Sequence, residues 1–134
     1  FLKFSAPGFV YSVGMPPPVA AAALTSLEIM QEEPERIERF HHNGNLFLRL
    51  ANAASLNTGL SKGYAVVPII LGSSVKAGRL SNMLFDEGIY VPPIIYPAVP
   101  EESARLRFFL SSEHSDAQLV EAIDKTKHCL DKLT

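Results

Sequence analysis

The sequence lacks most of the features that mark specialised classes of protein. It has one cysteine, Cys129, among 134 residues, so an internal disulfide framework is excluded and a reducing, cytoplasmic setting is expected. The formal net charge is −2 and no basic run is present, which argues against nucleic acid as a partner. No stretch approaches the roughly 20 apolar residues of a membrane-spanning helix, and no signal peptide is visible. We therefore expect neither a nucleic-acid partner nor a membrane segment.

Motifs of self-contained catalysis are also missing. There is no glycine loop that would cradle a phosphate, no internal repeat and no Ser/His/Asp arrangement with supporting context. His41 and His42 are neighbours on an expected helix, as are His128 and Cys129, so the members of each pair diverge. We expect no metal site and no nucleophilic pair from these residues.

What the chain does contain is enough apolar material for one packed core. Hydrophobic residues make up 47% and charged residues 19%, which is typical of a compact domain. Pro68 confines its strand to an edge of the sheet or to a ladder position where no N–H is needed, and Ser115 with Gln118 forms a capping box that begins the last helix. The patterns predict an α+β fold in which a small three-stranded sheet is covered by helices. The expected helices are 17–31, 34–55, 75–87 and 116–133, with a β-prone run at 9–13 and strands at 66–71, 89–91 and 104–110.

Arginine alternates with apolar residues in the last of these strands. Alternate residues of a strand share a face, so Arg105 and Arg107 point one way. Leu106, Phe108 and Leu110 point the other way and predict a core face. Two explanations remain open for the arginines: they snorkel into water at the rim of the sheet, or one presents a planar fork to a carboxylate. Spacing alone favours the rim, because strand arginines usually end in water.

Residues 92–100 form a stiff, apolar segment before that strand. Prolines occupy positions 92, 93, 97 and 100, which argues against ordinary pairing in a ladder. The segment is either a plain connector or an apolar wall beside a ligand pocket.

Six segments carry a joint resemblance: 11–17 (Tyr-Ser-Val-Gly-Met-Pro-Pro), 27–34, 88–92, 97–100, 104–107 (Ala-Arg-Leu-Arg) and 111–114 (Ser-Ser-Glu-His). Together they resemble the α-oxoamine synthases, pyridoxal-phosphate enzymes of the class II aminotransferase superfamily. The resemblance covers nearly the whole chain, in order. It implies that residues 33–134 form the C-terminal α+β small domain of a fold-type I enzyme. Residues 1–32 would be a connecting segment and helix from a large domain that precedes them.

The resemblance implies an acyltransferase that condenses an amino acid with an acyl-CoA or acyl-carrier thioester, working as a homodimer with pyridoxal 5'-phosphate. The Schiff-base lysine of the family would lie upstream of Phe1, so this chain would carry no catalytic residue and would be inactive alone. Arg107 matches the arginine that binds the amino-acid carboxylate. Ser12 matches the hydroxyl that reaches the phosphate of the partner subunit's cofactor. Ile95 and Ala98 would line the acyl pocket.

The chain departs from the family at two places. Further hydroxyls often follow the position of Ser12, where this chain has Val13 and Gly14. Arginine and threonine often stand where this chain has Ile95 and Ala98, which predicts an acyl group that is apolar near this wall. Two other hypotheses stay open: a stand-alone module that binds a small carboxylate through Arg107 or acts in regulation, and an interaction domain without a small-molecule site.

Overall fold

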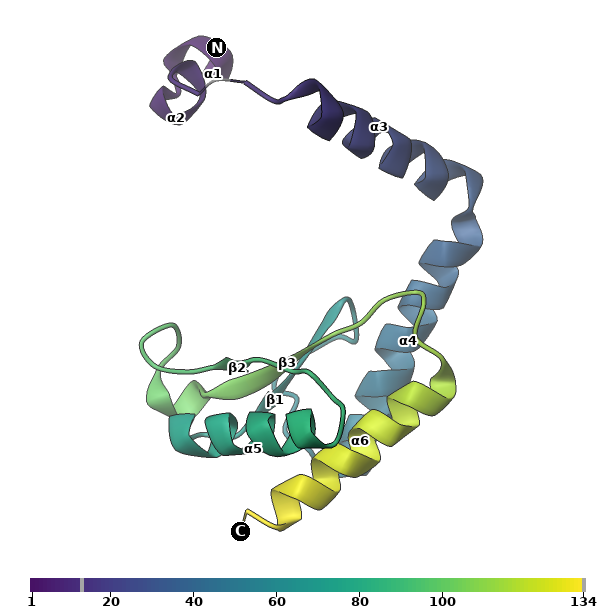
Figure 1. The fold of residues 1–134 in the computed structure, drawn as a ribbon, viewed down its shortest axis with the longest axis vertical. Helices are drawn as coiled ribbons and strands as arrows, with labels where there is room; N and C mark the ends of the chain where they lie inside the picture. Colours follow the sequence, from purple (N-terminus) through teal and green to yellow (C-terminus); the bar gives the residue numbers. More distant parts are fainter. Residues whose placement is uncertain (13, 134) are drawn as a thin grey trace. The chain divides into compact units, whose positions relative to one another are not determined.

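The computed structural model describes residues 1–12 and 14–133, and Figure 1 shows them as a ribbon. The chain forms two compact units, Phe1–Pro34 and a second that begins at Glu35. Across the described residues, no helix combines the length and apolar character needed to cross a membrane.

The first unit consists of helices. Two short ones, α1 (Leu2–Ser5) and α2 (Pro7–Val10), precede the longer α3 (Pro17–Glu32). Prolines at the start of α2 and α3 suit a first turn, where no N–H is needed. The predicted helix at 17–31 is therefore confirmed. No residue of α3 is buried, so its apolar side chains stay accessible to a partner surface.

The β-prone run predicted at 9–13 is wrong over the residues that the structure describes. Phe9 lies in α2, and the Tyr11 N–H donates to the Pro7 carbonyl at 3.2 Å. Pro7 fixes its own φ in the helical range, and this local turn overrides the β-propensity of the residues that follow. Val13 lies outside the described residues.

The second unit is built on a three-stranded antiparallel sheet in the order β1-β3-β2. Its strands are β1 (Val66–Ile70), β2 (Pro93–Ile94) and β3 (Arg105–Phe109), so the arginine strand is the central one. Pro68 lies on the edge strand β1 opposite Arg107, as its missing N–H requires. The predicted fold class, α+β with a small three-stranded sheet, is confirmed.

The second strand lies in a different place from the one predicted at 89–91. Val91 is buried and its carbonyl accepts a hydrogen bond from the Ser81 hydroxyl at 2.7 Å, which fastens this segment to a helix. Pairing with β3 begins later, at Pro93 and Ile94, inside the proline segment. Proline is tolerated there because β2 is a two-residue edge strand.

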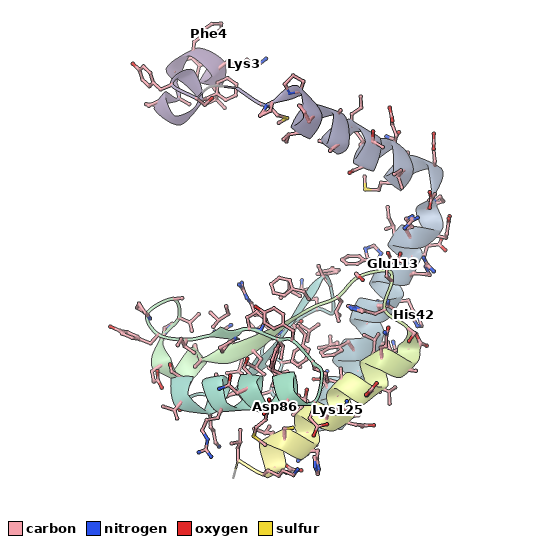
Figure 2. All side chains as sticks on the ribbon, viewed as in Figure 1. Lys3, Phe4, His42, Asp86, Glu113 and Lys125 are labelled. Atoms are coloured by element: carbon pink, nitrogen blue, oxygen red, sulfur yellow. The ribbon has the colours of Figure 1, made fainter. Side chains whose placement is uncertain are left out.

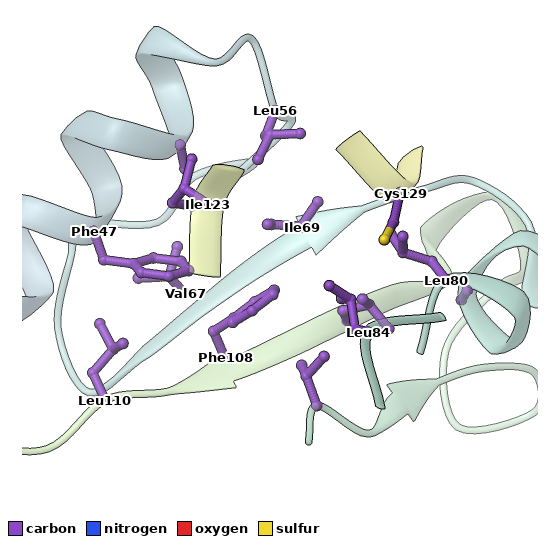
Figure 3. Close-up of a cluster of buried hydrophobic side chains, with 14 of the residues drawn as sticks. Phe47, Leu56, Val67, Ile69, Leu80, Leu84, Phe108, Leu110, Ile123 and Cys129 are labelled. Atoms are coloured by element: carbon purple, nitrogen blue, oxygen red, sulfur yellow. The ribbon is translucent and has the colours of Figure 1, made fainter. Parts of the chain in front are cut away.

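Three helices pack against one face of the sheet, as Figure 1 shows. They are α4 (Pro34–Ala53), α5 (Ser74–Asp86) and α6 (Asp116–Asp131), and a 3-10 turn, η1 (Glu101–Ser103), leads into β3. The capping box of Ser115 and Gln118 is present as predicted. The rings of Phe47 and Phe108 lie 5.0 Å apart between α4 and the sheet (Figure 3). Central members of the core include Phe47, Val67, Leu84, Leu106, Phe108 and Ile123.

The turn before α6 is fastened to α4 by polar contacts. The buried Asn43 donates from its amide nitrogen to the carbonyls of Ser111, at 2.8 Å, and His114, at 2.9 Å. His42 Nε2 lies 3.1 Å from Asp116 Oδ1, and Figure 2 shows His42 on α4 beside this turn. These contacts fix where β3 ends and α6 begins.

A contact between two glycines holds the loop before β1 against α4. A Cβ on Gly44 would lie 2.0 Å from the carbonyl oxygen of Gly63, so only glycine fits there. Gly63 has a φ of 74°, a left-handed conformation that favours glycine as well. The backbone approach sets the point from which β1 enters the sheet.

We predict that Gly44→Ala lowers the free energy of unfolding by at least about 1–3 kcal/mol, because the added methyl forces helix and loop apart. Gly78→Ala is the matched control, since Gly78 also lies within a helix but has nothing within 4 Å of its Cβ position. That control should be neutral or gain about 0.5–1 kcal/mol. Urea unfolding measures both variants, and equal stability of the two would contradict the close approach.

Candidate functional site

The face of the sheet turned away from the helices carries the arginines. Arg105, Arg107 and Phe109 share it on β3, while Leu106 and Phe108 are buried on the other side. Residues directly opposite each other in antiparallel strands share a face, so the pairing partners of these residues complete it. We call the set the outer face: Val66, Pro68, Ile70, Ile94, Arg105, Arg107 and Phe109.

The two arginines of the outer face differ in their contacts. Arg105 is half-buried and its Nε–H donates to the Ser103 carbonyl at 2.7 Å. Arg107 is exposed, and its guanidinium carbon lies 5.5 Å from the centroid of the Phe109 ring. In the described part of the chain, no carboxylate forms an ion pair with either arginine. Arg107 therefore offers its whole fork of donors to a ligand.

Residues 95–98, here called the wall turn, follow β2 directly. The Ala98 N–H donates to the Ile95 carbonyl at 2.9 Å, which closes the turn. Ile95 is 39% exposed and Ala98 is also exposed, so both side chains are accessible. Because Ile94 pairs with Arg105, the wall turn leaves the sheet beside the arginine strand. Arg107, Ile95 and Ala98 thus belong to the same unit, and the wall turn begins at the Arg105 end of β3.

Ser12 belongs to the first unit. Its hydroxyl donates to the Phe9 carbonyl at 2.8 Å and stays exposed. It lines a shallow hollow with Lys3, Phe4, Phe9 and Gly14, and Figure 2 labels Lys3 and Phe4 in this unit. A hydroxyl near an ammonium group is a donor set that suits a phosphate. The resemblance identifies Ser12 alone, because no spacing rule connects Lys3 with it.

A second hollow lies between α6, the end of β3 and residues 87–91. The Lys125 ammonium there donates to the Glu87 carbonyl at 2.8 Å and lies 2.8 Å from Glu121 Oε1. The hydrogen bond to Glu121 raises the pKa of Lys125. Its charge is already compensated, so this hollow is a poorer carboxylate site than the outer face. The only sequence signal for it was the four-residue spacing of Glu121 and Lys125.

The remaining ionisable and thiol side chains do not form a metal site or a nucleophilic site in the described residues. Among residues 1–12 and 14–133, no group of three or more His, Cys, Asp or Glu side chains could hold a metal ion. Cys129 is buried, and burial raises the pKa of its thiol. A buried thiol with a raised pKa is a core residue rather than a nucleophile.

A family model supplies the observation that decides the relationship. The model for aminotransferase class I and II matches residues 1–125. The chain belongs to this family.

Two named relatives show which members of the family the chain resembles. The chain is 39% identical to the 8-amino-7-oxononanoate synthase of Symbiobacterium thermophilum over 115 residues, covering 86% of this chain and 29% of that protein. It is 33% identical to the serine palmitoyltransferase of Sphingobacterium spiritivorum over 125 residues, covering 93% of this chain and 31% of that one. The chain therefore spans about 30% of the length of these relatives.

The fold agrees with the sequence relationship. A high-resolution structure of SPT with a PLP internal aldimine superposes with a TM-score of 0.88, covering 98% of this chain and 33% of that one, at 22% identity. The fold is therefore that of the fold-type I pyridoxal-phosphate enzymes. These comparisons confirm the resemblance to the α-oxoamine synthases seen in the sequence.

The carboxylate of Glu101 is tied to the start of α5, a contact that the sequence did not predict. Glu101 Oε1 accepts a hydrogen bond from the Ser74 N–H at 2.7 Å, and Glu101 Oε2 accepts one from the Ser74 hydroxyl. Both hydrogen bonds lower the pKa of Glu101 from its ordinary value of 4.5, and the bond from the Ser74 hydroxyl contributes more than the bond from the Ser74 N–H. No local pattern announces this pair, because the residues are separated by the whole of α5 and β2.

We predict a stability difference between the wild type and Glu101→Gln that depends on pH. A lowered folded-state pKa means that the folded protein binds fewer protons, so the contribution is complete above the unfolded pKa. It is lost as the pH falls below 4.5 through the folded pKa. Urea unfolding at a series of pH values should show a difference at neutral pH that shrinks on acidification. A difference independent of pH would contradict the hydrogen bonds to Ser74.

Proposed function

We propose that this chain is the C-terminal portion of a pyridoxal-phosphate-dependent acyltransferase that condenses an amino acid with an acyl-CoA or acyl-carrier thioester. The observation that carries the proposal is the exposed, unpaired Arg107 on the outer face of a chain in this family. The names of the relatives and the share of their length that the chain spans support it. The Schiff-base lysine would lie upstream of Phe1, so the chain alone would be inactive.

The two units support a division of labour in the longer protein. Residues 33–134 would be its small domain, and residues 1–32 would connect that domain to a large one. The separate core of the second unit and the accessible apolar side chains of α3 agree with this division.

Arg107 would bind and orient the amino acid. A guanidinium fork holds both oxygens of a carboxylate, which fixes the direction of the bonds at the neighbouring carbon. Phe109 supports the guanidinium from the same face of the strand. Pyridoxal phosphate, when bound, supplies the electron sink for carbanion chemistry at that carbon. The Arg105 Nε–H already donates to the Ser103 carbonyl. Arg105 would therefore be a neighbouring charge and not the residue that binds the carboxylate.

Ser12 would donate to the cofactor phosphate of the partner subunit in a homodimer. Its hydroxyl needs only to rotate away from the Phe9 carbonyl to do so. Lys3 in the same hollow would add a positive charge. The single cysteine favours a cytoplasmic location, which stays a prediction.

Ile95 and Ala98 would form an apolar wall of the acyl pocket. Neither side chain can donate a hydrogen bond or compensate a negative charge. Because leaving an anionic group against such a wall costs its solvation, the acyl group should be apolar at this point.

A stand-alone module that binds a small carboxylate is the second candidate. The free guanidinium of Arg107 and the separate core of the second unit speak for it. The intact mass of the native gene product separates the two, because only the acyltransferase requires a chain about three times as long.

We predict that Arg107→Lys in the longer protein raises the KM for the amino acid by roughly 10- to 100-fold, since a point charge replaces a two-point grip. Arg105→Lys is the matched control and should change this KM little. Steady-state kinetics with a saturating acyl donor measures both variants. If Arg105→Lys were the more damaging change, the assignment of the two arginines would be reversed.

We predict that the longer protein prefers acyl donors whose acyl chain is uncharged. Rates on a panel of thioesters with apolar and dicarboxylate-derived acyl groups test this. Ile95→Arg should shift the preference towards the charged donors, because it supplies a partner for the anionic end. A strong wild-type preference for dicarboxylate-derived donors would refute the apolar wall.

A further inference from the structure

Glu101 and Ser74 join three segments that the sheet does not connect. Glu101 lies at the start of η1, Ser74 begins α5, and the Ser74 hydroxyl oxygen accepts a hydrogen bond from the Tyr96 N–H at 3.2 Å. Tyr96 is the second residue of the wall turn. The chain of bonds thus runs from the 3-10 turn through the first turn of α5 into the wall turn. We call these three residues the clasp.

The clasp is not needed to begin α5. Ser73 already serves as the N-cap, because its side chain accepts from the Lys76 N–H. Ser74 is therefore free to turn its hydroxyl towards the wall turn. Glu102, the next residue of η1, makes no side-chain hydrogen bond to any residue in the described part of the chain, so the clasp depends on Glu101 specifically.

The other end of the clasp leads to the arginine strand. Three residues after Glu101, the Ala104 carbonyl accepts from the Leu71 N–H at 2.8 Å and from the Gly72 N–H at 3.2 Å. Ala104 is buried and is followed directly by β3. The clasp therefore relates the wall turn to a rigid point two residues before Leu106 and three before Arg107.

The clasp lies at the surface, outside the core. Glu101 and Tyr96 are exposed and Ser74 is half-buried. The wall turn is closed at the Ile95 carbonyl, which accepts from the Ala98 N–H at 2.9 Å and from the Val99 N–H at 3.4 Å, and the Tyr96–Ser74 bond ties the turn to α5. Removing the clasp should loosen the turn while leaving the packed core intact.

We propose that Glu101 and Ser74 are positioning residues for the acyl donor: they hold the wall turn at a fixed place at the Arg105 end of β3. The inference rests on the proposed function, in which Ile95 and Ala98 line the acyl pocket. A rigid wall limits the acyl group that fits, because binding then costs no ordering of the turn. Loosening the wall turn should weaken binding of the acyl donor. Binding of the amino acid, which Arg107 would hold, should be unaffected.

The test compares four variants of the longer protein: Ser74→Ala and Glu101→Gln, which break the clasp, and Ser74→Thr and Glu102→Gln as controls. Threonine keeps the hydroxyl, and Glu102→Gln removes the same charge one residue away. Two quantities are measured: the exchange rate of the Tyr96 amide hydrogen, and the separate KM values for acyl donor and amino acid. Circular dichroism checks that each variant is folded.

Breaking the clasp should speed exchange at Tyr96 severalfold and raise the KM for the acyl donor severalfold, with the KM for the amino acid unchanged. Ser74→Thr and Glu102→Gln should behave as the wild type. Unchanged exchange in Ser74→Ala would overturn the clasp. A parallel rise of both KM values would overturn the positioning role, since a general loss of structure would explain it.

The two proposals fail in different ways. If the wild type shows no acyl transfer with any thioester, the proposed function fails, and the positioning role falls with it whatever the exchange rates. If the wild type is active and faster exchange at Tyr96 leaves the KM for the acyl donor unchanged, only the positioning role fails.

Discussion

The alternation of side chains along β3 is the constraint on which the second unit depends. Leu106 and Phe108 anchor the helices from one face of this central strand, and Arg107 stands between them on the other. A slip of one residue in register would bury the guanidinium and expose the phenyl ring, so the core packing itself decides where Arg107 points. The position of Arg107, the candidate carboxylate-binding residue, is thus a consequence of hydrophobic burial. It is reinforced at the start of β1 by the contact of Gly44 with Gly63.

The division between the two arginines shows how a site arises from unequal contacts. Both are guanidinium groups on the outer face, but the Arg105 Nε–H is engaged by the Ser103 carbonyl while Arg107 keeps its donors free. Lys125 is a third cation beside a hollow, and its acidic neighbours Glu87 and Glu121 already compensate its charge. Hydrogen-bond donors that are available to a ligand, rather than the presence of a charge, distinguish Arg107.

Local patterns were sufficient to predict the elements that local interactions determine. Periodicity, capping and proline geometry were enough for the capping box of α6, the helices that begin at Pro17 and Pro34 and the two faces of β3. The β-prone run at 9–13 failed for a local reason, because the turn at Pro7 overrides β-propensity. Two other failures share a different cause, because each depends on a partner that no spacing rule reveals. Residues 89–91 were predicted as a strand, but the Ser81 hydroxyl holds Val91 against α5 instead. The clasp of Glu101 and Ser74 escaped for the same reason, since it joins residues on either side of a helix and a strand.

The central claim is that Arg107 is the group that receives a substrate carboxylate. Nitrogen-detected magnetic resonance of the arginine side chains in the longer protein tests it directly, with an amino acid and the corresponding amine without a carboxylate as ligands. The account predicts that the Nε–H signal of Arg107 shifts on addition of the amino acid and not of the amine, while that of Arg105 stays in place. A shift confined to Arg105, or the same response to both ligands, would contradict it.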